Sequence, residues 1–171
     1  MTALFLSRRG SVVTELALIF PLMMIMFLGC FEVTQLVRAY MGLSTTAQNV
    51  ADMLARQAPI PAGAISDACN GAKLAMSPVS GNHLSAAVVS VTKDVTNGSI
   101  GVDWQDTTCG GASAIANAST LATGVLLNKG DNVIVVKTTF TYNALISFVL
   151  PASVTLSQVA FARPRTGTAG S

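Results

Sequence analysis

Charge is scarce in this 171-residue chain. Charged residues make up 11% of the sequence and the formal net charge is only +2, whereas an average soluble domain carries about 25% charged residues. No cluster of lysine or arginine occurs beyond the pairs Arg8–Arg9 and Arg163–Arg165. So little positive charge argues against a nucleic-acid partner, and the two pairs are better read as membrane-side and tail charge.

The sequence also lacks a set of residues that could support catalysis or bind a metal. Its one histidine, His83, follows Gly81 and Asn82 in a loop-like stretch, and no nucleophile elbow lies near it. Asp94, Asp103 and Asp106 surround a predicted hairpin, but EF-hand spacing is absent, and no cysteine–histidine spacing fits a zinc site. We therefore expect no enzymatic activity, no cofactor and no metal.

Hydrophobic residues are abundant, at 51%, and their longest run lies near the N-terminus. As a helix, residues 11–31 would extend about 31 Å, close to the roughly 30 Å hydrocarbon core of a bilayer. Arg8 and Arg9 precede this run, and no basic residue follows it until Arg38. The positive-inside rule then places the N-terminus in the cytoplasm and the chain after Glu32 outside.

Several conventional roles compete for this apolar segment. A cleaved secretory signal should end in an A-x-A-like site, which is missing here. The stretch FLGC, ending at Cys30, is similar to a lipobox, although Phe27 stands where leucine is usual. The twin-arginine pattern is weak, because Gly10 and Ser11 follow the arginines instead of apolar residues. A lipoprotein attached at Cys30 and a simple retained anchor therefore stay open as alternatives.

The helical pattern continues past the apolar run, until Pro59 and Pro61 end it near residue 58. Pro21 and Gly42 are the expected bends. The apolar face of this second half is expected to comprise Val33, Leu36, Val37, Tyr40, Leu43, Ala47, Val50, Ala51, Leu54 and Ala58. Mostly on the opposite, polar side we expect Glu32, Arg38, Gln48, Asn49, Asp52 and Arg56.

The rest of the chain predicts a short helix followed by β-structure. The helix is expected within 62–76, and strands are expected at 84–95, 99–108, 133–142 and 154–161, the first two joined by the turn signal TNGS. The apolar stretch ALISFVL, at 144–150, is either a buried loop or an exposed patch. The fold class is thus α+β, with a long N-terminal helix, transmembrane and then amphipathic, packed on a small antiparallel β-sheet.

These observations divide the chain into five parts. They are a cytoplasmic leader (1–10), the transmembrane half of the helix (11–31), its exported amphipathic half (32–58), a small exported α+β domain (59–163) and a flexible tail (164–171).

The residues around the leader resemble a known family. The stretch GSVVTE is similar to the processing site of type IV pilin-like precursors, and the wider N-terminal pattern resembles the TadE/TadG-like pseudopilins of the tight-adherence (Tad, or Flp) pilus, TadE-like by length. Positions that fit are Arg9, Gly10, Glu15, Ala17, Leu18, Pro21, Gly29 and Glu32. The segments GDNVIVVKTTFTY and LSQVAFARPR resemble later parts of the same family.

The resemblance implies a pilin-like fold and a structural role. It implies cleavage between Gly10 and Ser11 by a prepilin peptidase, which makes Glu15 the fifth residue of the mature chain. The Glu15 carboxylate would then pair with the new N-terminal amine of a neighbouring subunit and set the register; otherwise Glu15 simply caps the helix start. Implied partners are the bacterial inner membrane, other pilin or pseudopilin subunits and the pilus assembly platform. The exported domain would be periplasmic, or extracellular within an assembled pilus.

The three cysteines fall into two groups. Cys30 lies within the apolar run and is expected to be a reduced, packed thiol. Cys69 and Cys109 lie in the exported part, where disulfides persist, and a bridge between them would stabilise the domain by about 3–4 kcal/mol. Two unrelated small residues are the alternative.

Overall fold

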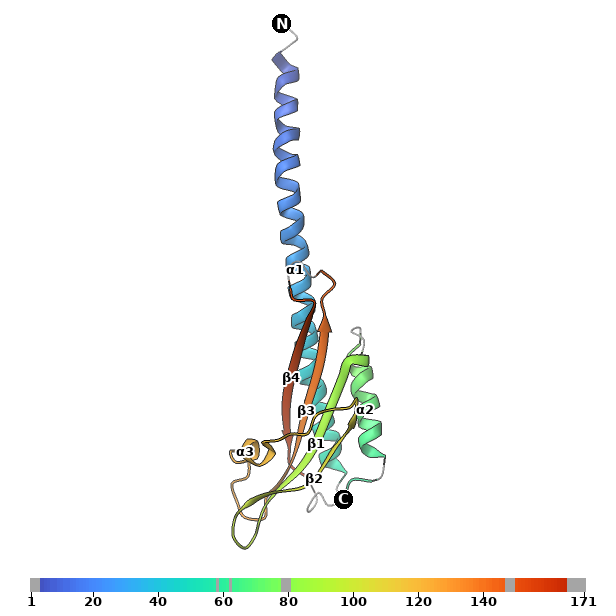
Figure 1. Ribbon diagram of the computed structural model, residues 1–171, viewed down its shortest axis with the longest axis vertical. Coiled ribbons are helices and arrows are strands. Elements are labelled where there is room, and N and C mark those ends of the chain that lie inside the picture. The colour runs from blue at the N-terminus through green and yellow to red at the C-terminus, as the bar shows by residue number, and fades with distance from the viewer. Residues whose placement is uncertain (1–3, 58, 62, 78–80, 147–149, 166–171) are drawn as a thin grey trace.

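The structure is a computed structural model that describes residues 4–57, 59–61, 63–77, 81–146 and 150–165, with residues 4–11 described for their backbone alone. Its elements, in order, are α1 (Leu4–Arg56), α2 (Ala64–Ala75), the short 3-10 helix η1 (Gly81–His83), β1 (Leu84–Lys93), β2 (Ile100–Cys109), α3 (Ala118–Ala122), β3 (Asn132–Asn143) and β4 (Ser153–Ala162). The C-terminal half of α1 lies along a four-stranded antiparallel sheet, and its N-terminal half projects alone (Figure 1). The predicted α+β arrangement is confirmed.

The strands are arranged in the order β2-β1-β3-β4, and every neighbouring pair is antiparallel. The β1–β2 turn is closed by Asp94, whose carboxylate accepts the backbone N–H groups of Thr96 and Asn97 at 2.7 and 3.0 Å. These bonds, that from Asn97 first, lower the pKa of Asp94. The central strands β1 and β3 are covered on both faces over much of their length, which explains their valine-rich sequence.

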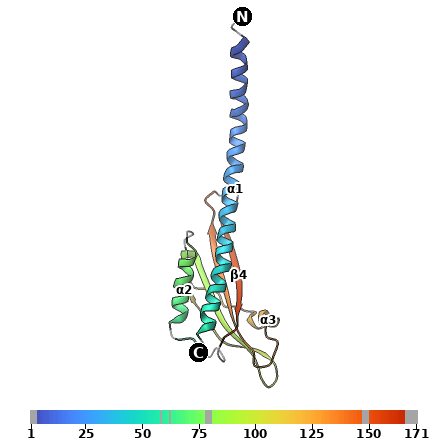
Figure 2. The same ribbon diagram turned by 180° about the vertical axis from the view of Figure 1, so that it is seen from behind.

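α1 and α2 lie side by side on one face of the sheet (Figure 2). Small alanines on α1 let it approach the strands closely, while Leu43 and Leu54 fill the space between. The buried residues of this main core are Ala39, Leu43, Ala47, Val50, Ala51, Leu54, Ala55, Ala68, Ala72, Met76, Leu84, Val88, Ile134, Val136, Phe140, Tyr142 and Ala160. The C-terminal half of α1 is therefore held by packing on the sheet.

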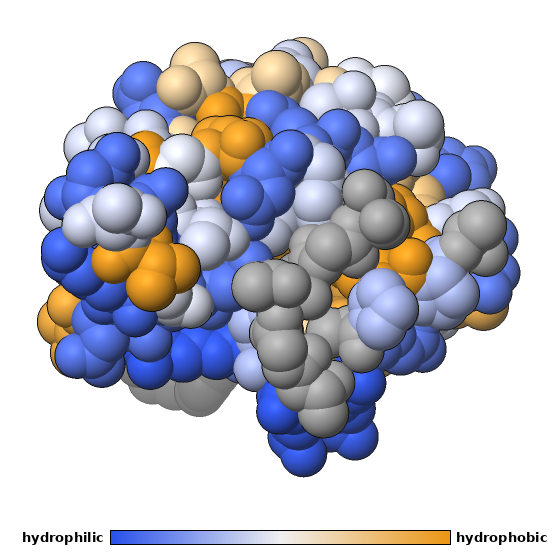
Figure 3. All heavy atoms as spheres, turned by 90° about the horizontal axis from the view of Figure 1, so that it is seen from below, coloured by the Kyte–Doolittle hydropathy of each residue, from blue (hydrophilic) through white to orange (hydrophobic). Residues whose placement is uncertain are grey.

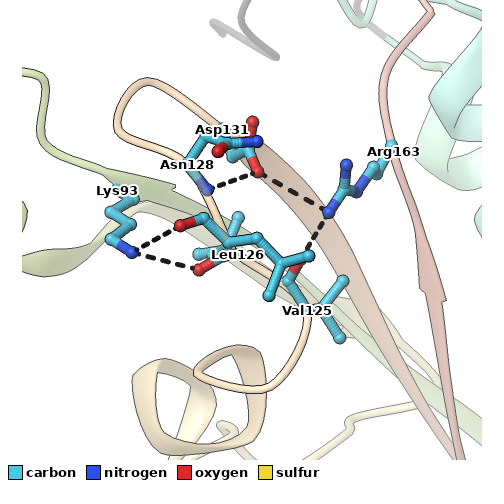
Figure 4. Close-up of polar contacts among 7 residues, drawn as sticks. Lys93, Val125, Leu126, Asn128, Asp131 and Arg163 are labelled. Carbon is cyan, nitrogen blue, oxygen red and sulfur yellow. Dashed lines mark hydrogen bonds and ion pairs between the residues drawn. The ribbon is translucent and has the colours of Figure 1, made fainter.

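A second, smaller core covers the other face at the end of the sheet farthest from the N-terminus. There Ala118, Ala122 and Leu126 pack on valines of β1 and β3. The segment after α3 is fixed by two cations, as Figure 4 shows: Lys93 Nζ donates to the carbonyl oxygens of Leu126 and Leu127 at 3.3 and 3.0 Å, and Arg163 lies 3.6 Å from the Asp131 carboxylate.

The chain after β4 returns to the end of α1. The backbone N–H of Arg165 donates to the Ala55 carbonyl at 3.1 Å, and the Arg165 guanidinium lies 3.6 Å from Asp52. Arg165 falls within the predicted flexible tail, yet it occupies one of the carbonyl groups that a helix C-terminus leaves without a partner. Residues 166–171 lie outside the described residues.

Candidate functional site

The N-terminal half of α1 is an exposed apolar helix. From Val12 to Phe27 the side chains are exposed, and among the described residues this is the one helix long and apolar enough to cross a membrane, with a mean hydropathy of 2.3. A signal sequence or a core helix can satisfy the same criterion. Here the apolar segment is not a core helix, because only 6% of it is buried within the chain.

The predicted processing site lies within this helix. α1 begins at Leu4 and runs without interruption through Gly10 and Ser11, so the helix includes part of the predicted leader as well as the mature segment. Glu15 is exposed one turn further on and lines a shallow hollow with Thr14, Leu18 and Ile19. The structure thus places the predicted cleavage site and the predicted register residue within about 8 Å along one helix axis.

Glu32, where the apolar segment ends, is the least expected feature of the helix. Its side chain is fully buried, at 0% exposure, against the sheet. The Glu32 Oε1 atom accepts the Tyr142 hydroxyl at 3.0 Å and the backbone N–H of Leu145 at 2.9 Å. No hydrogen-bond donor among the described residues reaches Oε2. The placement of Glu32 on the polar side of the helix was wrong.

The buried contact also changes the chemistry of Tyr142. Burial first, and then the hydrogen bond to Glu32 and the negative charge of Glu32, raise the pKa of Tyr142 to about 12. The phenol therefore stays protonated at neutral pH and remains a donor to the carboxylate. This pair connects α1 to the end of β3 and the start of the β3–β4 loop.

The buried face of α1 is rotated relative to the predicted face. Leu36 is half-buried and Leu43, Ala47, Val50, Ala51 and Leu54 are buried as expected, but Ala39, Thr46 and Ala55 complete the contact surface. Val33, Val37 and Tyr40 were expected to pack on the sheet and are instead 46%, 44% and 49% exposed. Together with Met41, which is 62% exposed, they form an exposed apolar stripe that continues the apolar surface onto the C-terminal half of α1. Ala58 lies outside the described residues.

The cysteines are placed as follows. Cys69 of α2 and Cys109 at the end of β2 form a disulfide and are nearly buried. The bridge ties α2 to the edge of the sheet. Cys30 is free and exposed, unlike the packed thiol expected from sequence.

The remaining polar candidates do not converge. His83 lies in η1, and the side chains of Asp94 and Asp106 form local turns. Asp103 Oδ2 accepts Ser90 Oγ at 3.0 Å and Asn132 Nδ2 at 3.3 Å. No group of three or more metal-ligating side chains occurs among the described residues.

Comparison with protein families gives one finding that bears on the apolar helix. Residues 10–52 match the family model described as TadE-like protein. The match covers 43 of the 171 residues and lies entirely within α1. The match begins at Gly10, includes Glu15 and Glu32, and ends within α1, which confirms the predicted TadE-like resemblance for this helix. The later segments GDNVIVVKTTFTY and LSQVAFARPR lie outside the match. No curated protein and no solved structure matches the chain.

The TadE-like match and the exposed apolar helix support each other. Taken together they indicate a membrane protein associated with a Tad pilus, with α1 fitting a single-pass membrane anchor. Sequence reasoning found this anchor and its family but missed the burial of Glu32. The available signal was spacing, because Glu32 precedes the buried Ala39 by seven residues and Leu43 by eleven, which places all three on one helical face.

Proposed function

We propose that the chain is a minor pilin-like subunit that assembles with, primes or caps a Tad-type pilus through α1. The observation that supports this most directly is that the N-terminal half of α1 is one continuous apolar helix with almost no contacts inside its own chain. A membrane anchor needs such a helix only for the length of the bilayer. A subunit that leaves the bilayer needs it to pack on neighbouring helices.

The exposed apolar stripe of Val33, Val37, Tyr40 and Met41 favours the assembling role over a simple anchor. These residues lie on the exported half of α1, past the apolar segment, and the sheet leaves them uncovered. An apolar stripe at helical spacing is suited to packing against another helix. In a filament, neighbouring α1 helices would cover it.

In this proposal a prepilin peptidase cuts between Gly10 and Ser11 on the cytoplasmic side, and the sheet domain lies in the periplasm. Glu15 then has a role that differs between membrane and filament. Near the membrane surface, water and the helix dipole make a carboxylate tolerable. In a packed bundle of helices, the charge needs an oppositely charged group, and the Ser11 ammonium of a neighbouring subunit would provide it and set the axial register.

The test compares Glu15→Ala, Gly10→Val and the control Thr14→Ala, a polar-to-alanine change next to Glu15, in cells that contain the pilus system. Breaking a buried ion pair costs about 3–5 kcal/mol, or about two to four orders of magnitude in association. Glu15→Ala should therefore accumulate in the membrane and fail to co-purify with pilin subunits, whereas Thr14→Ala should assemble. Gly10→Val should remain full length, as determined by N-terminal sequencing of the membrane fraction.

Three results would contradict the proposal. Normal assembly of Glu15→Ala would remove the role of the carboxylate. A wild-type protein that keeps its N-terminus would favour the alternative of a retained single-pass binding protein, and a mature chain beginning at a lipid-modified Cys30 would favour a lipoprotein.

A further inference from the structure

The two edge strands of the sheet differ in how well they are protected. β2 forms one edge and β4 the other. β2 contains Asp103 and Asp106, and its pairing with β1 is interrupted by two register shifts. β4 pairs with β3 along its whole length without a shift, and its sequence SVTLSQVAFA contains no charged residue, glycine or proline. Charges, bulges and proline are the usual means that keep an edge strand from pairing with another chain, and β4 has none of them.

The register shows which backbone groups of β4 point to the open edge. In an antiparallel ladder, opposite residues alternate between pairs that exchange backbone hydrogen bonds and pairs that do not. The Ala144 N–H donates to the Ala152 carbonyl at 3.1 Å, and this pair extends the register beyond Asn143–Ser153. Even-numbered residues of β4 therefore bond to β3, and odd-numbered residues direct their N–H and C=O groups outward. The outward residues are Ser153, Thr155, Ser157, Val159 and Phe161, whose side chains are exposed and whose backbone groups accept or donate no hydrogen bond from outside the sheet among the described residues.

The open edge of β4 lies beside the exposed apolar stripe of α1. In Figures 1 and 2, α2 and β4 lie on opposite sides of α1. Gln35 and Gly42 are on the side of α2, because they line a hollow together with Met76 at the end of α2. At about 100° per residue, Val37 and Tyr40 of the stripe lie roughly opposite to them around the helix, on the side of β4. The stripe and the outer edge of β4 thus belong to one side of the domain.

The end of the domain farthest from the N-terminus is less suited to such a contact. Figure 3, seen from that end, shows a surface that is mostly hydrophilic with scattered apolar residues. Lys93, Asp94, Lys129 and Asp131 lie around the turns there. A neighbouring subunit is therefore expected beside the domain, along β4, and not below it.

The direction of β4 limits which strand can pair with it. β4 begins near Glu32, since Val154 is opposite Tyr142, and the chain after β4 reaches Ala55, so β4 and α1 run in the same direction. Two copies joined by antiparallel β4 strands would have α1 helices that point in opposite directions, and parallel β4 strands would place the helices on opposite faces of the joined sheet. A copy in the same orientation would present β2, which runs antiparallel to β4, but the charges and register shifts of β2 oppose pairing. These constraints favour a strand from a different subunit.

We infer that a neighbouring pilin subunit, different from this chain, adds a strand to the outer edge of β4 while its own helix packs on the stripe of α1. The added strand runs antiparallel to β4 and is uncharged, because the outward side chains of β4 are hydroxyl groups followed by Val159 and Phe161. In strand addition of this kind, main-chain hydrogen bonds provide the affinity and alternate side chains provide the specificity. This inference rests on the proposed function, in which α1 packs against the helices of neighbouring subunits.

The experiment introduces proline where a backbone N–H points outward. Ser157→Pro removes one outward donor, and proline is tolerated on an edge strand when its nitrogen faces solvent. The matched control Ser157→Ala removes the same hydroxyl group but keeps the N–H. Thr155→Pro repeats the test at the preceding outward position. Each full-length variant is produced in cells that contain the pilus system and purified from the membrane fraction, and the pilin subunits that accompany it are identified and quantified.

We expect both proline variants to keep the wild-type midpoint of urea unfolding in lipid nanodiscs. They should recover less pilin by about tenfold or more, because a carbonyl group of the added strand would lose its donor, whereas Ser157→Ala should recover the wild-type amount. Hydrogen exchange resolved to single residues tests the contact directly. In the isolated wild-type chain the N–H groups of Ser157 and Val159 should exchange fast and that of Gln158 slowly, and in the complex with pilin all three should exchange slowly.

The possible outcomes separate this inference from the proposed function. Wild-type recovery of pilin by both proline variants would overturn the added strand, even where Glu15→Ala fails to assemble and the proposed function holds. Unfolding of Ser157→Pro would show that its N–H bonds to β3, and would also overturn the inference. Slow exchange of Ser157 and Val159 in the isolated chain would mean that a second copy, not a different subunit, covers the edge. Failure of the wild type itself to recover pilin would instead contradict the proposed function on which the inference depends.

Discussion

The hydrogen bond between Tyr142 and Glu32 should contribute measurably to the stability of the sheet domain. Tyr142→Phe removes one hydroxyl and leaves the ring, which is only 5% exposed, in its place. Glu32 would then keep one donor, the Leu145 N–H, for two buried oxygen atoms. A hydrogen bond to a charged group is worth about 1.5–3 kcal/mol, so the free energy of unfolding should fall by about that amount.

The measurement is urea unfolding of the full chain in lipid nanodiscs, followed by the fluorescence of Trp104, the single tryptophan. The matched control is Tyr40→Phe, the same change at the other tyrosine, which is 49% exposed on α1. We expect that control to change the stability by less than about 0.5 kcal/mol. The denaturant slope should stay constant in both variants, because the surface exposed on unfolding is unchanged.

A double-mutant cycle separates the hydrogen bond from the packing of the ring. Glu32→Gln keeps an oxygen acceptor but removes the charge, so the remaining bond to Tyr142 should be worth about 0.5–1.5 kcal/mol. Tyr142→Phe should therefore cost about 1 kcal/mol less in the Glu32→Gln background than in the wild type. Equal costs in both backgrounds, or an equal effect of the two tyrosine substitutions, would refute the charged contact as the reason.

Two further predictions concern the same domain. In a Tyr40→Phe background, ultraviolet absorbance should show Tyr142 ionising near pH 12. The pKa of Tyr142 in the folded state lies above its unfolded value of about 10, so the folded state binds the phenol proton more tightly. The resulting stabilisation is complete below pH 10 and is lost as pH rises through 12. Glu32→Gln should lower the pKa of Tyr142 but leave the increase that burial causes. An unchanged pKa of Tyr142 in the Glu32→Gln variant would contradict the assignment. Cys69 and Cys109 should resist alkylation until they are reduced, and reduction should lower the stability by about 3–4 kcal/mol; labelling of both thiols without a reductant would show that the bridge is absent.

The local structure of the domain could be read from the sequence because its signals are strong and short-range. The strand predicted at 154–161 is found at Ser153–Ala162, and that predicted at 133–142 is found at Asn132–Asn143. Alternating or valine-rich runs bounded by turn residues determine such elements. The order β2-β1-β3-β4 was not predicted, because β1 pairs with β3 and these strands are separated in the sequence by β2 and α3.

The rotation of α1 shows why the rest could not be predicted. Helical periodicity reveals that apolar residues line up but not which partner each row contacts. Val33, Val37 and Tyr40 belong to one row and Ala39, Leu43 and Val50 to another, and only the second contacts the sheet. A helix that serves two partners shows a broad apolar surface in its sequence. Glu32 was predicted to face solvent because buried carboxylates are rare unless they are paired. Its hydrogen-bond donors come from residues 142 and 145, which are distant in the sequence.

The two glutamates of α1 are therefore suited to different tasks along one rigid element. Glu32 is buried by its own chain and fixes the sheet domain and its β3–β4 loop at one height on the helix. Glu15 is exposed in the apolar segment about 25 Å away along the axis, where the proposed neighbour would fix the height of one helix against the next. A continuous helix is stiff along its axis. Formation of the Glu32 contact and of the proposed Glu15 contact would therefore fix the axial position of every domain in the assembly. The internal contact must form first, since an assembling helix can align its domain with those of its neighbours only if that domain is already held at a constant position.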